Sequence, residues 1–194
     1  MNFISIAVLA GAVAAPAPLL AQAPAPKRGP GPPADATAIV LADFAKRVTA
    51  YAELRKSLEK GEARLQQHRD PAKIDAQRKA LVANIVNARA AAKPGDIFTI
   101  ESRPVFKRLL SPQLKGADGK ENKAAIDADN PGPMPLKVNQ PYPKGEPLST
   151  VPPDILKVLP VLPEDLEYRF IGKHLILYDA RAGLIIDYVP NAIP

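Results

Sequence analysis

The sequence contains no cysteine and no tryptophan, and only 5% of its 194 residues are aromatic. The absence of cysteine excludes disulfides, thiolate metal sites, cysteine nucleophiles and a lipoprotein anchor, because each of these needs a thiol group. The shortage of aromatic rings argues against a base-stacking nucleic-acid module and against an aromatic-lined sugar cleft. No nucleic-acid partner is therefore expected.

Catalytic and metal-binding motifs are also missing. The two histidines, His68 and His174, do not have the spacing of shared metal ligands, and neither a G-x-S-x-G motif nor a glycine-rich phosphate loop occurs. We expect His68 to be solvated, His174 to lie at the rim of a strand, and Glu164 and Asp165 to form a turn and a cap. The sequence thus predicts no metal, no cofactor and no catalytic residue, and it favours a protein without enzymatic activity. A hydrolase site assembled by the fold from dispersed residues stays as the alternative.

The chain begins with an apolar leader. Residues 3–15 are all apolar or small, which is roughly the length of a signal-peptide core and shorter than a membrane-spanning helix. Residues 21–23, Ala-Gln-Ala, supply the small-x-small pattern that a signal peptidase recognises, so we predict a signal peptide over residues 1–23 with cleavage after Ala23. Export from a bacterial cytoplasm, to the periplasm or the medium, is the expected result; the alternative is an uncleaved anchor over residues 3–23. Residues 24–34, rich in Pro, Ala and Gly, should form a tether.

Residues 35–194 are predicted to form a single α+β domain, which is mainly helical over residues 35–129. Two long amphipathic patterns, one from Asp35 to near Gly61 and one from Asp70 to Pro94, predict helices that pack antiparallel as a hairpin. A third helix is expected around residues 104–114 and a short polar one over residues 119–129. The apolar stripes of the first two helices comprise Val40, Phe44, Val48, Tyr51, Leu54 and Leu58 in one, and Ile74, Leu81, Ile85, Ala88 and Ala92 in the other.

The next segment, residues 130–165, is rich in proline and is predicted to be extended, because proline interrupts both helices and central strands. Its apolar residues indicate that it lies along the surface of the domain, where it could form a binding groove. These residues are Met134, Leu136, Val138, Tyr142 and Leu148.

The last segment, residues 166–194, is predicted to form a three-stranded antiparallel meander. Its strands are rich in branched and aromatic residues and are separated by two short Gly-containing turns. Neighbouring apolar pairs within the strands indicate a sheet covered on both faces, with the helices as the expected cover.

The run LEYRFIGKHLILYD at residues 166–179, with GLIID at 183–187, resembles the C-terminal signature of an uncharacterised family of exported bacterial proteins. The GDIFT turn at residues 95–99 and the NQPYP segment at 139–143 are similar to the same family. This resemblance implies that the protein is exported and shares the shape of that family, but it implies no activity. The final hairpin is also faintly similar to that of small periplasmic nickel and cobalt homeostasis proteins of the RcnB type.

Positive charge is concentrated in the predicted helical hairpin. Residues 35–93 carry 12 basic and 7 acidic side chains, a net charge of +5 in a chain whose total is +6. One interpretation is a solvated helical face; the other is attraction to an anionic membrane surface or envelope polymer. For the second, the predicted contacts are Lys46, Arg47, Arg55, Lys56 and Lys60. The expected function is therefore that of a non-catalytic, exported binding or structural protein of the bacterial envelope.

Overall fold

The computed structural model describes residues 34–60 and 70–194. The leader, the predicted cleavage site at Ala23, nearly all of the tether and His68 lie outside these residues. No helix among the described residues is long and apolar enough to cross a membrane.

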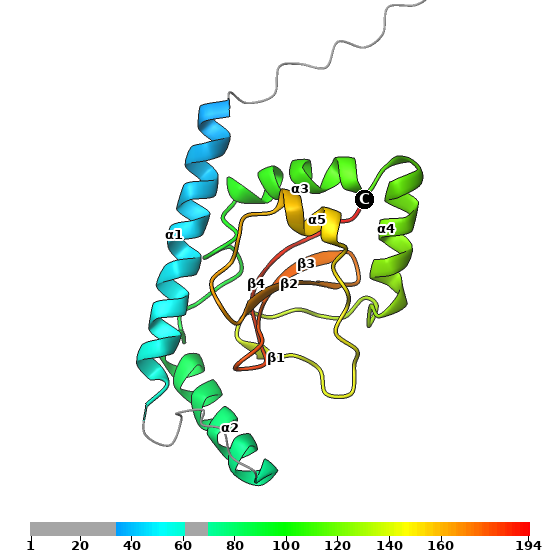
Figure 1. The fold of residues 1–194 in the computed structure, drawn as a ribbon. Coiled ribbons are helices and arrows are strands. Elements are labelled where there is room, and N and C mark those ends of the chain that lie inside the picture. The colour runs from blue at the N-terminus through cyan, green and yellow to red at the C-terminus, as the bar shows by residue number, and fades with distance from the viewer. Residues whose placement is uncertain (1–33, 61–69) are drawn as a thin grey trace, which may run out of the picture. The chain divides into compact units, whose positions relative to one another are not determined.

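Helices precede a small antiparallel sheet, which confirms the α+β class (Figure 1). The strand order is β1-β4-β3-β2, so the last three strands form the predicted meander. The elements are α1 (Ala34–Leu58), α2 (Pro71–Ala88), α3 (Ser102–Gln113), α4 (Gly116–Ala128), β1 (Gln140–Pro141), α5 (Pro153–Val158), β2 (Leu166–Ile171), β3 (His174–Asp179) and β4 (Leu184–Val189).

Local sequence explains where some of these elements begin and end. The Asp70 carboxylate accepts the backbone N–H of Ala72 at 3.0 Å, so it caps α2 ahead of Pro71. Helix α1 starts at Ala34, one residue before the predicted start at Asp35, so Asp35 lies in its first turn. Gly172 has a φ of +53° in the β2–β3 turn, and a Cβ there would lie 3.0 Å from the Cα of Pro133. Glycine at this position therefore permits both the turn and the close passage of the Pro-rich segment.

The prediction of an antiparallel helical hairpin holds only in part. The Asn84 side chain donates to the Leu58 carbonyl at 3.3 Å, so the second half of α2 meets the end of α1. Only Leu81 and Ile85 of α2 are buried, and the first half of the helix extends past α1 (Figure 1).

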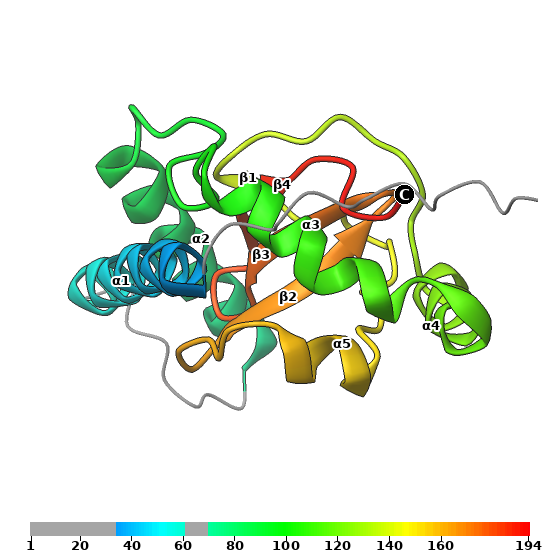
Figure 2. The ribbon, with the colours of Figure 1, turned by 90° about the horizontal axis from the view of Figure 1, so that it is seen from above.

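The main core lies between the helices and one face of the sheet. Figure 2 shows α3 crossing over the strands, with α5 alongside β2. Three phenylalanines from different segments, Phe44, Phe98 and Phe106, pack together here with ring centroids 4.7–5.1 Å apart. They pack against Phe170 and Leu177 of the sheet, all within one buried apolar cluster.

The opposite face of the sheet has a different cover from the one predicted. Ile176 and Ile185, which are fully buried, contact Met134, Leu136 and Tyr142 of the Pro-rich segment. The expectation that helices cover both faces is therefore wrong, whereas the expectation that this segment lies along the domain is confirmed. The segment also contributes β1, a two-residue edge strand on β4, so the sheet has four strands instead of three.

Candidate functional site

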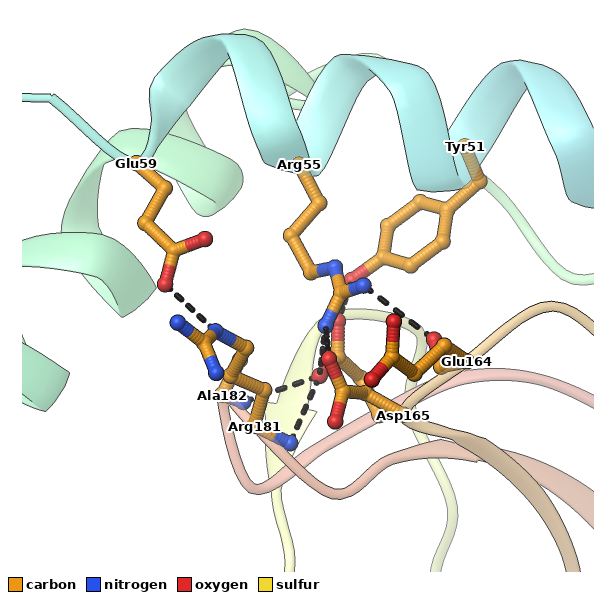
Figure 3. A network of polar contacts seen from close by, with 8 residues as sticks. Tyr51, Arg55, Glu59, Glu164, Asp165, Arg181 and Ala182 are labelled. Carbon is orange, nitrogen blue, oxygen red and sulfur yellow. Dashed lines mark hydrogen bonds and ion pairs between the residues drawn. The ribbon is translucent and has the colours of Figure 1, made fainter. Parts of the chain in front are cut away.

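A cluster of charged side chains lies between α1 and the sheet (Figure 3). At its centre is Arg55, which is only 1% exposed. Its guanidinium donates to the Asp165 carboxylate at 2.9 Å and to the Glu164 carbonyl at 3.2 Å, and it lies 3.7 Å from the Asp179 carboxylate. A buried cation is thus matched by two carboxylates that flank the sheet.

The Asp179 carboxylate is fully buried and has further partners. It accepts the Tyr51 hydroxyl at 2.7 Å and the backbone N–H groups of Arg181 and Ala182 at 3.0 and 2.8 Å. Burial, with the nearby Asp179 charge, raises the pKa of Tyr51 well above its ordinary value, so this hydroxyl remains a donor. Glu59, at the end of α1, adds an ion pair with Arg181 in the β3–β4 turn.

A second buried carboxylate, Asp187 on β4, holds the turn that precedes α3. Its oxygens accept the backbone N–H groups of Gly95 at 3.0 Å and of Ile97 and Phe98 at 2.8 Å. Burial raises the pKa of Asp187, and these N–H groups oppose that rise. The Arg89 guanidinium lies nearby over the Tyr51 ring, 5.0 Å from its centroid.

These charges have the character of a structural clamp. Every carboxylate in the cluster is bonded to another part of the fold, and together they fix α1 and the 95–98 turn onto the meander. Two grooves, one lined by Leu156 and Val161 and the other lying beside α2, include none of Tyr51, Arg55, Asp179 or Asp187 in their linings. A substrate bound in either groove would therefore not contact this cluster.

The structure corrects one of the predicted surface contacts. Arg55 is buried and paired, so it cannot reach an anionic surface. Lys46, Lys56 and Lys60 are exposed. Arg47 is also exposed, but it pairs with Asp43 at 2.6 Å and donates to the Asp96 carbonyl at 3.0 Å. Binding of an anionic surface by Lys46, Arg47, Lys56 and Lys60 stays a prediction, and Arg55 is removed from the predicted contacts.

The serine and histidine side chains that a hydrolase could use are hydrogen-bonded to backbone groups. The Ser57, Ser102 and Ser149 hydroxyls donate to the carbonyls of Leu54, Thr99 and Phe170. His174 accepts the Asn191 backbone N–H on its Nδ1 at 3.2 Å, so this nitrogen carries no proton in the contact. Among residues 34–60 and 70–194, no group of three or more His, Cys, Asp or Glu side chains could hold a metal ion.

A groove of about 670 Å³ lies between α2 and the Pro-rich segment. Two apolar side chains at its walls are exposed to solvent, Val86 at 37% and Leu148 at 40%. Its lining comprises Asp75, Arg78, Lys79, Val82, Ala83, Val86 and Asn87 from α2, residues 141–144, Glu146 and Leu148 from the Pro-rich segment, and Tyr178, Ala182 and Gly183 from the sheet.

Hydrogen bonds hold the two walls of this groove in place. The Asn139 side chain donates to the Arg89 carbonyl at 3.0 Å, which joins the Pro-rich segment to the chain just after α2. The Tyr142 N–H donates to the Gly183 carbonyl at 2.9 Å and fixes the same segment to the sheet. The groove is thus preformed.

Sequence reasoning found one wall of the groove and missed the other. The sequence offered the Pro-rich segment only as one that could form a groove, and nothing local to residues 75–87 indicated that α2 would face it. The clamp was missed although Arg55 follows Val48 by seven residues and Tyr51 by four, which places it on the apolar stripe of α1.

Comparison with models of protein families, with curated proteins and with solved structures finds no match for this chain. A function for it must therefore be argued from its own residues.

Proposed function

We propose that this protein is an exported, non-catalytic binding protein of the bacterial envelope, and that its ligand site is the groove between α2 and the Pro-rich segment. The observation that carries the proposal is a preformed groove with Val86 and Leu148 exposed on its walls. Soluble surfaces tolerate single apolar residues, but apolar walls around a concave site favour ligand binding.

Two further features support this reading over the hydrolase alternative. The buried acids Asp179 and Asp187 are bonded to α1 and to the turn before α3, so they stabilise the fold. The serine hydroxyls described above donate to backbone carbonyls instead of to a base. Export is supported by the apolar leader and the Ala-Gln-Ala sequence before Pro24.

A neutral apolar fluorescent probe, N-phenyl-1-naphthylamine, tests the site. The wild type should enhance its fluorescence saturably, and Val86→Asp should abolish this because a carboxylate is placed on the apolar wall. The matched control is Ile100→Asp, at an isoleucine that is 76% exposed and outside the groove lining. Equal loss in both variants, or no saturable signal from the wild type, would reject the groove as the site.

Export is tested separately by the intact mass of the protein from the envelope fraction or the medium. The expected mature chain starts at Pro24. A product that retains Met1 in the membrane fraction would show instead that the leader is an anchor.

A further inference from the structure

One edge of the sheet carries backbone groups that point away from the other strands. Strand β2 is last in the strand order, so only one of its sides pairs with β3. In an antiparallel strand, the N–H and C=O groups of alternate residues face opposite sides. The Ser149 hydroxyl accepts the Phe170 N–H at 2.7 Å and donates to the Phe170 carbonyl at 2.8 Å, so the groups of Phe170 face outward. Because the pairing of β2 with β3 is regular, those of Tyr168 and Leu166 face outward as well.

The chain itself closes this edge only at its two ends. Ser149 takes the place of a neighbouring strand beside Phe170, and the Leu166 N–H donates to the Pro163 carbonyl at 3.2 Å. Between these ends, no hydrogen bond joins the N–H or C=O of Tyr168, or the C=O of Leu166, to another residue that the structure describes. One donor and two acceptors are thus available, and unpaired groups on an edge strand are a template for pairing with another chain.

A groove of about 500 Å³ runs along these groups. Four consecutive residues of β2, 166–169, line it, and because their side chains alternate between the two faces, a groove that contacts all four follows the edge of the strand. Leu156 of α5 and Val161 also line it and are 47% and 95% exposed. We call it the edge groove; it shares no lining residue with the groove beside α2, and its other lining residues are Thr150, Val151, Pro160 and Leu162.

The two faces of the sheet ask for different side chains in an occupant of the edge groove. Tyr168 and Ile155 of α5 belong to the main apolar cluster, so a residue paired opposite Tyr168 would direct its side chain toward α5 and Leu156. A neighbouring residue would point to the other face, where Arg169 and Glu167 form an ion pair at 2.6 Å. Since these two charges neutralise each other, the fitting sequence alternates apolar and uncharged polar residues.

The same contacts limit what the occupant can be. Antiparallel pairing of two copies of β2 about Tyr168 would place Phe170 of each copy opposite Leu166 of the other, but Ser149 already fills the space beside Phe170. A second copy of this edge therefore does not fit. A small apolar molecule would cover Leu156 and Val161 but would leave the three backbone groups unpaired, which is costly once water is displaced.

We propose that the edge groove binds a short extended peptide segment of another protein. The segment adds a strand to β2 at Tyr168, places an apolar side chain beside Leu156 and Val161, and ends or turns away at Ser149. This is a second binding site, beyond the groove beside α2, and it does not depend on that groove.

The first test uses the capped peptide acetyl-Thr-Val-Thr-Val-Thr-amide, whose residues alternate between apolar and uncharged polar. It is titrated into isotope-labelled wild-type protein and followed by NMR. The Tyr168 amide proton should move downfield saturably as it forms a hydrogen bond, whereas the Phe170 amide, which already donates to Ser149, should change little. Absence of a saturable shift at Tyr168 would overturn the proposal.

Two N-methylated versions of this peptide test whether its backbone makes the contact. One is methylated on the valine amides and the other on the threonine amides, and only one of these two sets can face β2. That version should bind about five- to tenfold more weakly than the unmodified peptide, and the other should bind about equally well. Loss in the valine version indicates an antiparallel strand, and loss in the threonine version a parallel one. Equal affinity of the two versions, whether kept or lost, would overturn strand addition.

Variants place the peptide in the edge groove. Leu156→Asp and Val161→Asp should each weaken binding about five- to tenfold, because a carboxylate replaces an apolar contact, and both positions are exposed enough to keep the fold. The matched control is Val86→Asp, at an exposed valine of the groove beside α2, which should bind the peptide like the wild type. Unchanged affinity in both edge variants, or equal loss in the control, would overturn this location and leave the groove beside α2 to its own test.

Discussion

Replacing Arg55 by methionine should destabilise the protein by about 3 kcal/mol. Methionine keeps most of the unbranched stem but removes the guanidinium, which leaves the fully buried Asp179 carboxylate without its cation. Breaking a buried ion pair typically costs about 3–5 kcal/mol. We expect the lower end because the Tyr51 hydroxyl and two backbone N–H groups still solvate Asp179.

Urea denaturation followed by circular dichroism measures this change in the free energy of unfolding. In a thermal melt, Tm should fall by roughly 6–12 °C, given about 2–4 °C per kcal/mol for a chain of this size. The control is Lys56→Met, which removes the same charge from the next position of α1. Because Lys56 is exposed, that variant should stay within about 0.5 kcal/mol of the wild type.

A double-mutant cycle with Asp165→Asn separates the ion pair from packing. Asparagine tolerates the positive φ of 66° at this position, so the backbone should not be strained. The coupling energy between Arg55 and Asp165 should exceed about 0.5 kcal/mol, as for residues in direct contact. If Arg55→Met is no more destabilising than Lys56→Met, the guanidinium is not buried in solution and the clamp does not exist.

Three further predictions follow from the same contacts. Asp187→Ala should destabilise the protein more than Asp187→Asn, because the asparagine amide oxygen can still accept backbone N–H groups of the 95–98 turn; equal melting temperatures would contradict this. Truncation after Gly183 should unfold the protein, since it removes the buried strand β4; a cooperative melt near the parent temperature would show that β4 is dispensable. Sedimentation with anionic vesicles at low salt should be lost at high salt and weakened by Lys56→Glu with Lys60→Glu, whereas unchanged sedimentation would leave these lysines as a solvated face.

Much of the fold could be predicted because its signals are local. A helical period of apolar residues gives α1 and α3, the Asp70-Pro71 pair marks the start of α2, and Gly172 and Gly183 separate the strands of the meander. Each of these signals lies within a dozen residues. Short-range sterics and burial periodicity are therefore enough to place them.

The clamp was not predicted because Arg55 was assigned to the surface from its charge, without regard to its position on the helix. Arg55 was assigned to the surface as a cation, although its spacing from Val48 and Tyr51 puts it on the buried stripe of α1. Asp187 gave a similar signal, as a carboxylate between Ile186 and Tyr188 in an otherwise apolar strand. A charge within a buried pattern predicts a buried partner, but the sequence alone does not say which one.

The groove could not be predicted for a different reason: its walls come together only through long-range contacts. Residues 75–87 and 141–148 are joined by Asn139 donating to the Arg89 carbonyl, and by β1 pairing with β4. Since β4 is also where Asp187 holds the turn before α3, the strand that supports one wall is itself fixed from the opposite face of the sheet. Loosening the Asp187 contacts should therefore reduce ligand affinity in the groove as well as stability, although Asp187 is not part of its lining.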